Sequence, residues 1–354
     1  MKIFSKIYNW IIDSNVRISC SVLALVSILL LIIGVVTRFH IENSFLQGIF
    51  IESFGMLFDL VVIGILAGWL ISRNPKRHVI KRYFDEIDDF RGWESEEASH
   101  RIRGNIIRLN KLNVTEINLG SCFLRQADLC GAKLQRAILV KAMLQEANLE
   151  KANLQEANLW YANLQSSVLD GANLREAILG GANLGQAHLF ETNLRRAQLG
   201  SANLQNALLV KANLQKANLG GADLQGANLK GADLQNASVW SAQLQRAVLA
   251  GANLEQANLF EANLQNANLS EANLQNAHLG GADLQGADLS NANLQKAQLG
   301  DTNLQQANLN DVKNLTAEQL QRARSWGQAI NIPDYILQEL KTKNHIDKDS
   351  GHPL

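Results

Sequence analysis

The amino-acid sequence predicts a mainly β solenoid, in which the chain winds around an axis in stacked coils. Leucine recurs at every fifth position from Leu119 to Leu309, and only Val239 interrupts the series. Alanine stands two residues earlier from Ala127 to Ala307, and the three exceptions are Ser167, Thr192 and Thr302. A period of five fits neither a helix, which turns by about 100° per residue, nor a strand, whose side chains alternate. Short extended segments joined by bends would direct every leucine to one axis, as a fixed-period repeat requires.

The repeats A-N-L-x-x and A-D-L-x-x resemble the pentapeptide-repeat family over roughly residues 114 to 310. The resemblance implies a right-handed quadrilateral β-helix with four pentapeptides per coil, leucine and alanine inside and the other three positions outside. Coils stacked at about 4.8 Å would give about ten coils and a rod of about 48 Å. Five glycines of the array can adopt positive φ at the bends: Gly171, Gly181, Gly221, Gly231 and Gly251.

Two apolar stretches precede the repeats. Residues 18–37 are uncharged between Arg17 and Arg38, and residues 53–72 are interrupted only by Asp59. Each stretch is long enough to cross a hydrocarbon core of about 30 Å, so we expect a two-helix transmembrane hairpin. A cleaved signal peptide is the alternative for the first stretch, but no small-residue cleavage site precedes Arg38. We expect Asp59 to face the partner helix or water, and an ion path is the alternative.

Basic residues flank the predicted hairpin. Lys2, Lys6 and Arg17 lie in residues 1–17, whereas the loop between the spans holds Arg38 with two glutamates. A basic cluster follows the second span and consists of Arg73, Lys76, Arg77, Lys81 and Arg82. The positive-inside rule therefore predicts an integral membrane protein with both termini cytoplasmic, in a plasma or thylakoid membrane. The basic cluster is also a candidate contact for anionic headgroups.

Both ends of the rod need covers, because an open stack of coils exposes strand edges. We expect residues 73–113 to form a basic linker and a helical N-terminal cap. Within it, helical spacing relates Ile102, Ile106, Leu109 and Leu112.

A second helical cap is expected at residues 315–342. Thr316 and Gln319 form a capping-box pattern, with Leu315 and Leu320 as a hydrophobic staple, so a helix should begin at Thr316. One face of this cap should carry Leu320, Ala323, Trp326 and Ile330. Pro333 should open a second short helix through Leu340. The polar residues 343–354 lack periodicity and are expected to be disordered.

The composition argues against a catalytic, cofactor-binding or metal site. The chain has 33 basic and 33 acidic residues, so its zero net charge predicts no global attraction to nucleic acid. Its three cysteines are scattered without a disulfide or metal-ligand spacing, which fits a reducing compartment. His188 and His278 are the histidines within the array, and both occupy outward positions expected to be solvated. No phosphate loop, paired-carboxylate motif or Cys/His pattern is present. We therefore expect no enzyme, cofactor, metal or small-molecule substrate.

Outward positions twenty residues apart should stack on one side of the rod. Two such columns are mostly glutamine, and their amides are expected to hydrogen-bond along the axis: Gln145, Gln165, Gln205, Gln225, Gln245, Gln265, Gln285 and Gln305, and Gln135, Gln155, Gln215, Gln235, Gln275 and Gln295. The other two faces carry large apolar residues. One should present Ile138, Val140, Trp160, Ile178, Trp240 and Phe260, and the opposite one Val168, Phe190, Leu208, Val210 and Val248. These are candidate docking residues for a partner, and drift of the repeat is the alternative.

These features predict a non-enzymatic, membrane-tethered scaffold whose rod binds a protein partner or another copy of itself. One alternative is mimicry of DNA, because some members of the resembled family imitate duplex DNA and inhibit gyrase. Residues 115–312 hold 17 acidic and 13 basic side chains, a slight excess for a polyanion. A further alternative, an accessory subunit of a channel or transporter, rests on Asp59 and the hairpin.

Overall fold

The computed structural model describes residues 34, 59, 62–63 and 75–342. The predicted spans at 18–37 and 53–72 lie almost entirely outside the described residues, as do Arg73 and residues 343–354. Among the residues that are described, no helix has both the length and the apolar character needed to cross a bilayer. The chain divides into two compact units, Met1–Arg82 and Tyr83–Leu354.

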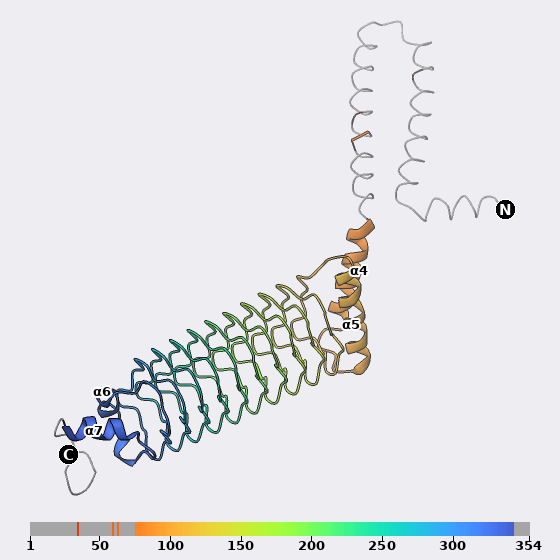
Figure 1. Cartoon of the computed structure of the whole chain (residues 1–354). Coiled ribbons are helices and arrows are strands. Elements are labelled where there is room, and N and C mark those ends of the chain that lie inside the picture. The colour runs from red at the N-terminus through yellow and green to blue at the C-terminus, as the bar shows by residue number, and fades with distance from the viewer. Residues whose placement is uncertain (1–33, 35–58, 60–61, 64–74, 343–354) are drawn as a thin grey trace. The chain divides into compact units, whose positions relative to one another are not determined.

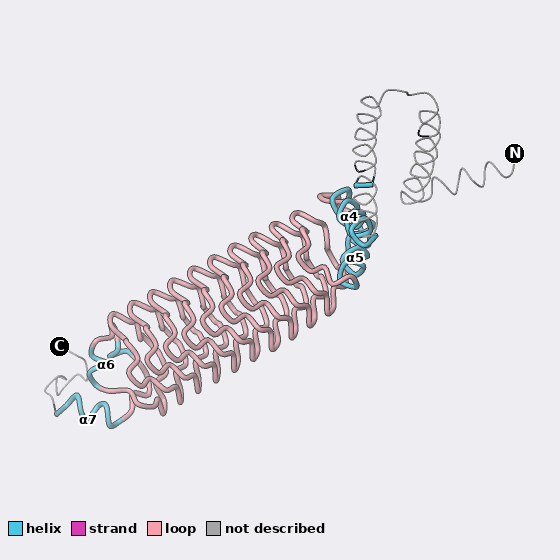
Figure 2. Tube along the Cα trace, turned by 90° about the horizontal axis from the view of Figure 1, so that it is seen from above, coloured by secondary structure: helices cyan, strands magenta, loops and turns pink. Residues whose placement is uncertain are grey.

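Helices lie at the two ends of the second unit and a long rod of coils lies between them (Figure 1). The helices are α4 (Pro75–Asp89), which begins in the first unit, α5 (Glu96–Lys111), α6 (Ala317–Gln321), the 3-10 helix η1 (Trp326–Gln328) and α7 (Asp334–Thr342). The rod itself is made of bends and single bridges, so it is drawn as loop throughout in Figure 2.

The rod is four-sided, with twenty residues in each coil. Parallel bridges join residues twenty apart, such as Asn118 and Ile138, and they form four columns around the axis. The column from Asn118 to Gln298 contains nine bridges, which makes ten coils. This confirms the predicted number of units per coil and the predicted number of coils. The right-handed sense stays a prediction from the resemblance.

Each five-residue unit is a short extended segment followed by a bend. In one such unit the Ala127 amide donates to the Leu124 carbonyl at 3.1 Å, and the Leu124 amide donates to the next coil at Met143 O, 2.7 Å away. Gln126, the third residue of this bend, has φ of 55°, as in a type II turn. The same position is left-handed in every unit from residue 121 to residue 311. The five predicted glycines hold φ of 63° or 64° there: Gly171, Gly181, Gly221, Gly231 and Gly251.

Leucine and alanine fill the interior as predicted. The repeat leucines from Leu119 to Leu309, and Val239 in their series, are at most 2% exposed. The three polar replacements of alanine are also fully buried, and each hydroxyl finds a backbone acceptor. Ser167 donates to the Leu164 carbonyl at 2.7 Å, and Thr192 and Thr302 each donate to a carbonyl at 2.8 Å.

The predicted glutamine ladders are wrong. No hydrogen bond joins glutamines twenty residues apart within the described rod, and Gln205 instead donates to Asp223 at 2.6 Å. The axial amide ladders belong to the asparagines that precede the leucines, as where Asn173 Nδ2 donates to Asn153 Oδ1 at 3.2 Å. The Asn173 Oδ1 also accepts from the Arg175 amide at 3.2 Å. Asparagine succeeds because it lies in the bridged columns on the flat sides, whereas the glutamines lie at the bends.

Side chains of the N-terminal cap replace a missing strand at the first coil. Ile102, Ile106 and Leu109 of α5 are fully buried. The Asn110 Oδ1 accepts from the Lys133 amide at 2.7 Å, and its Nδ2 donates to the Lys133 carbonyl at 2.8 Å. Three other side chains donate to carbonyls of this edge: Arg91 to Asn118, Ser99 to Arg125, and Arg103 to Asp128. Side chains of the cap therefore hydrogen-bond to the backbone groups at the exposed edge of the first coil.

The C-terminal cap begins as expected at Thr316. Thr316 is the N-cap of α6, and the capping box with Gln319 is formed in both directions. Gln319 Nε2 also donates to the carbonyls of Leu294 and Ala297, both at 2.9 Å. The Gln319 side chain thus hydrogen-bonds both to the N-cap of α6 and to the backbone at the end of the rod.

The expectation of one helical face through Ile330 is wrong. α6 ends at Gln321, and Ile330 is 49% exposed. The backbone of Ile330 instead pairs with the last coil, donating to Ala307 O at 2.9 Å and accepting from Leu309 N at 3.0 Å. Hydrogen bonding to the open backbone groups of the last coil stabilises this segment more than continuation of the helix would. The other three residues of the predicted face, Leu320, Ala323 and Trp326, are buried, and α7 follows directly after Pro333.

Candidate docking surfaces of the rod

One side of the rod carries most of its exposed aromatic residues, and we call it the tryptophan face. It contains the predicted residues Ile138, Val140, Trp160, Ile178, Trp240 and Phe260. The twenty-residue register places all six on this side or at its corner. Trp160 is 50% exposed and Trp240 is 48% exposed, whereas Val140 is half-buried. Large apolar side chains therefore face solvent along several consecutive coils.

The opposite side, which we call the phenylalanine face, carries Val168, Phe190, Leu208, Val210 and Val248. Phe190 and Leu208 are exposed, and the three valines are half-buried. The Lys211 ammonium lies over the Phe190 ring at 5.8 Å from its centroid and pairs with Glu191 at 3.6 Å. The phenylalanine face therefore has fewer exposed aromatic rings than the tryptophan face, and the Lys211 side chain, paired with Glu191, covers part of the Phe190 ring.

A column of glycines lies at the corner of the tryptophan face, between its two tryptophans. A Cβ on Gly180 would lie 3.2 Å from the Trp160 indole, and a Cβ on Gly220 would lie 2.4 Å from that of Trp240. The two indoles thus lean toward each other along the axis. Gly200 lies between them, and a Cβ there would meet only a backbone oxygen, at 3.7 Å. We call this stretch of backbone, formed by Gly180, Gly200 and Gly220 with an indole over each end, the glycine slot.

Tyr161 completes one wall of the glycine slot. Its ring lies 5.0 Å from the Trp160 ring, and a Cβ on Gly181 would clash with it at 2.4 Å. The sequence reasoning missed Tyr161 and the slot. The available signal was the return of glycine at 180, 200 and 220, which matches one full coil. At that spacing three residues without side chains adjoin one another along the axis, and the indoles of Trp160 and Trp240 cover the outer two.

Replacing Gly220 with alanine should displace the Trp240 indole, because the new methyl group would occupy the space of the ring. We expect a loss of about 1 kcal/mol in the free energy of unfolding from this overpacking, together with altered tryptophan fluorescence. Gly200→Ala is the matched control, because its methyl group would make only an ordinary contact, with the Gly220 carbonyl oxygen at 3.7 Å. Equal fluorescence spectra for the two variants would contradict the placement of Trp240.

The other edge of the tryptophan face is basic beside the slot. Over the same coils it carries Arg175, Glu176, Arg195, Arg196 and Lys216. Glu176 pairs with Arg175 at 2.9 Å and with Arg196 at 3.2 Å, and their hydrogen bonds hold the pKa of its carboxyl below the usual range. Arg195 and Lys216 form no ion pair within the described residues. Four positive charges against one negative charge leave this edge attractive to acidic groups.

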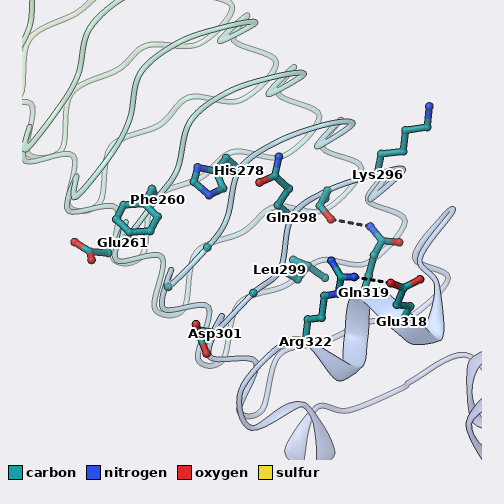
Figure 3. Close-up of a pocket in the computed structure, with 14 residues that line it drawn as sticks. Phe260, Glu261, His278, Lys296, Gln298, Leu299, Asp301, Glu318, Gln319 and Arg322 are labelled. Atoms are coloured by element: carbon teal, nitrogen blue, oxygen red, sulfur yellow. Dashed lines mark hydrogen bonds and ion pairs between the residues drawn. The ribbon is translucent and has the colours of Figure 1, made fainter.

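A cavity of about 740 Å³ opens where the tryptophan face meets α6 (Figure 3). The Phe260 and His278 rings stack at 5.3 Å on the rod side, so His278 is half-buried rather than simply solvated. On the other side of the cavity, Arg322 at the C-cap of α6 pairs with Glu318 of the same helix at 2.5 Å. Its other charged lining residues, Glu261, Lys296 and Asp301, give it mixed polarity without a nucleophile and base in contact.

The described residues offer no metal centre, since no group of three or more His, Cys, Asp or Glu side chains converges. Burial raises the pKa of the Cys122 thiol to about 11, so this thiol stays protonated at neutral pH and is a poor nucleophile. The candidate headgroup residues Lys76, Arg77, Lys81 and Arg82 are exposed on α4. Nothing in the described part of the chain assembles a catalytic constellation.

Comparisons with known proteins agree with the coil architecture. A family model described as pentapeptide repeats matches residues 109–150, 139–171, 167–206, 202–240, 241–276 and 272–311. The chain is similar to HetL, a pentapeptide repeat protein involved in heterocyst differentiation regulation from the cyanobacterium Nostoc sp. strain PCC 7120. The identity is 36%, the TM-score is 0.53, and the match covers 58% of this chain and 95% of HetL.

Two further structures are similar at lower identity. A pentapeptide repeat protein from the thylakoid lumen of Arabidopsis thaliana is 28% identical with a TM-score of 0.24, and the match covers 38% of this chain and 84% of that one. QnrB1, a plasmid-mediated fluoroquinolone resistance protein, is 18% identical with a TM-score of 0.31, and the match covers 52% of this chain and 94% of QnrB1. No curated protein matches the chain.

Proposed function

The chain belongs to the pentapeptide-repeat family, and from this premise we propose that it is a membrane-tethered scaffold whose rod docks a protein partner. Proteins of this family are generally non-enzymatic, which fits the lack of a catalytic constellation among the described residues. The likeness to HetL, which is involved in regulating a differentiation process, favours a binding role for the rod of this chain as well.

The observation that carries the proposal is the exposure of Trp160 and Trp240 on one face of a stiff rod. Two half-exposed indoles in register are costly to leave in water, at roughly 25 cal/mol per Å² of apolar surface. Tryptophan is enriched among the residues that dominate binding energy. The hydrogen-bonded coils hold both rings at a fixed spacing, so little conformational entropy is lost when a partner binds.

The tether is supported by the apolar stretches 18–37 and 53–72, each of which is long enough to span a bilayer. The basic residues around them favour cytoplasmic termini in a plasma or thylakoid membrane, and α4 would then carry Lys76, Arg77 and Lys81 near anionic headgroups. Mimicry of DNA has less support, because residues 115–312 hold 17 acidic and 13 basic side chains. A role in a channel or transporter would rest on the hairpin alone.

Changing Trp160 and Trp240 together to serine should reduce capture of the native partner at least about 30-fold, as expected for two hot-spot residues. The measurement is affinity purification of the tagged full chain from alkaline-washed native membranes, with thermal unfolding to show that the rod is intact. Phe190→Ser on the opposite face is the matched control. Undiminished capture by the double variant would count against this face, and loss of the chain during the alkaline wash would count against the tether.

A further inference from the structure

Another exposed tryptophan projects from the turn between α4 and α5, which we call the Trp93 turn (residues 90–95). Trp93 is 61% exposed, the most of any tryptophan in the described residues. Its amide donates to the Phe90 carbonyl at 3.2 Å, and its ring meets the Phe90 ring edge-on at 5.6 Å. Gly92 supplies the left-handed residue of the turn, with φ of 76°. The turn thus holds a large apolar side chain in water in a defined conformation.

The Trp93 turn lies within a strongly acidic segment. Residues 85–97 contain seven acidic side chains and one basic side chain, and the latter, Arg91, is paired with Asp88 at 2.5 Å. Glu94 and Glu96 form no ion pair within the described part of the chain. Interaction with the helix dipole favours Glu96 in the first turn of α5, but Glu94 lies before the helix and gains nothing from it.

The glycine slot offers the complementary features. Its walls are Trp160 with Tyr161 at one end and Trp240 at the other, and its floor is backbone. Gly180 and Gly220 are two coils apart, or about 10 Å at the usual spacing of paired strands, and the uncovered Gly200 lies between them. The unpaired side chains of Arg195 and Lys216 lie on the other edge of the same face.

We propose that the Trp93 turn of one copy docks into the glycine slot of a second copy of this chain. The inference rests on the proposed docking role of the tryptophan face. The Trp93 indole lies over Gly200 between the aromatic walls, where apolar contact and ring packing stabilise it. Glu94 and Glu96 reach Arg195 and Lys216, and these pairs set the orientation of the bound turn.

The charges on the two sides are complementary. Glu94 and Glu96 lie one and three residues from the indole of the Trp93 turn, and the basic edge lies across the tryptophan face from Gly200. A lipid surface suits this turn less well, because its acidic residues would repel anionic headgroups.

This contact is heterologous, because each copy contributes its turn to one neighbour and its slot to another. Two defective copies can therefore complement each other. A turn-defective copy, Trp93→Ser, keeps its slot, and a slot-defective copy, Gly200→Leu, keeps its turn. Gly200→Leu places a large side chain over the slot without an initial clash, because a Cβ at that position would make only an ordinary contact, with the Gly220 carbonyl oxygen at 3.7 Å.

The experiment measures self-association of the full chain in detergent by sedimentation and by energy transfer between labelled copies. We expect wild type to associate and each variant alone to associate at least about 30-fold more weakly, as for loss of a tryptophan hot spot. The 1:1 mixture should recover association up to the dimer. Phe190→Ser should associate like wild type, and exchange of Arg195 and Lys216 for glutamate should be rescued by Glu94→Lys with Glu96→Lys.

Three results would overturn the inference: a monomeric wild type, wild-type association by Trp93→Ser, or a mixture that stays monomeric. Association lost in Gly200→Leu but kept in Trp93→Ser would reject the Trp93 turn as occupant while leaving the docking role of the face intact. Association kept in both variants would reject the slot altogether. Thermal unfolding of each variant separates these results from a failure to fold.

Discussion

Replacing Leu229 with aspartate is expected to prevent the rod from folding. Leu229 is fully buried, and its truncation to alanine alone would cost about 2 to 5 kcal/mol. Aspartate adds the cost of an unpaired carboxylate in an apolar interior, where the described structure offers no basic partner. Since each coil contacts only its neighbours, the defect removes two coil interfaces at once. Circular dichroism of the purified chain during heating measures the loss.

Lys230→Asp is the matched control for this change. Lys230 follows Leu229 directly, is exposed and forms no ion pair among the described residues. The same aspartate there should change the free energy of unfolding by no more than about 0.5 kcal/mol. If Leu229→Asp unfolded at the temperature of Lys230→Asp, the inward position of the leucines would be wrong.

Replacing Asn110 with alanine is expected to destabilise the first coil by about 2 to 3 kcal/mol. The Asn110 side chain satisfies both the amide and the carbonyl of Lys133 and also donates to the Val114 carbonyl at 3.1 Å. Its loss removes three hydrogen bonds to backbone groups, each worth about 0.5 to 1.5 kcal/mol. The opened edge is also a template for pairing with another chain. Hydrogen exchange at Lys133 and light scattering measure the two effects.

Asn228→Ala provides the comparison within the rod. Asn228 is likewise half-buried, but its side chain accepts one hydrogen bond, from the Lys230 amide at 3.1 Å. We expect Asn228→Ala to lower the free energy of unfolding by about 1 kcal/mol. We expect no aggregation, because the coils on either side stay paired. Similar hydrogen exchange and light scattering for Asn110→Ala and Asn228→Ala would show that the cap does not protect the edge of the first coil.

Much of the candidate site could be placed from the sequence once four units per coil were assumed. That register puts Trp160 and Trp240 on one face and Phe190 on the other, and the bridges between residues twenty apart share it. The glycine slot was only partly visible in this way, because the return of glycine at 180, 200 and 220 does not give the directions in which the two indoles lean. His278 was expected to be solvated, since sequence position does not reveal its stacking on Phe260.

The ends of the rod show the same division more clearly. The capping box at Thr316 is local, so the pattern of residues was enough to locate the start of α6. Ile330 was misplaced because its partner, Ala307, belongs to the last coil and lies 23 residues earlier. Residues of the N-terminal cap such as Asn110 likewise act on a distant edge, and helical periodicity carries no information about that contact.

The sequence by itself determined the solenoid and its buried leucine columns, because both depend on a side-chain pattern repeated at a fixed interval, and the resemblance to a known family supplied the four-unit coil. Only the tertiary structure decided which amides form the ladders, how the caps close the open edges and where the glycine slot lies. These features depend on the hydrogen-bonding needs of backbone groups and on the free space between coils. Both quantities arise only when residues distant in the chain are brought together.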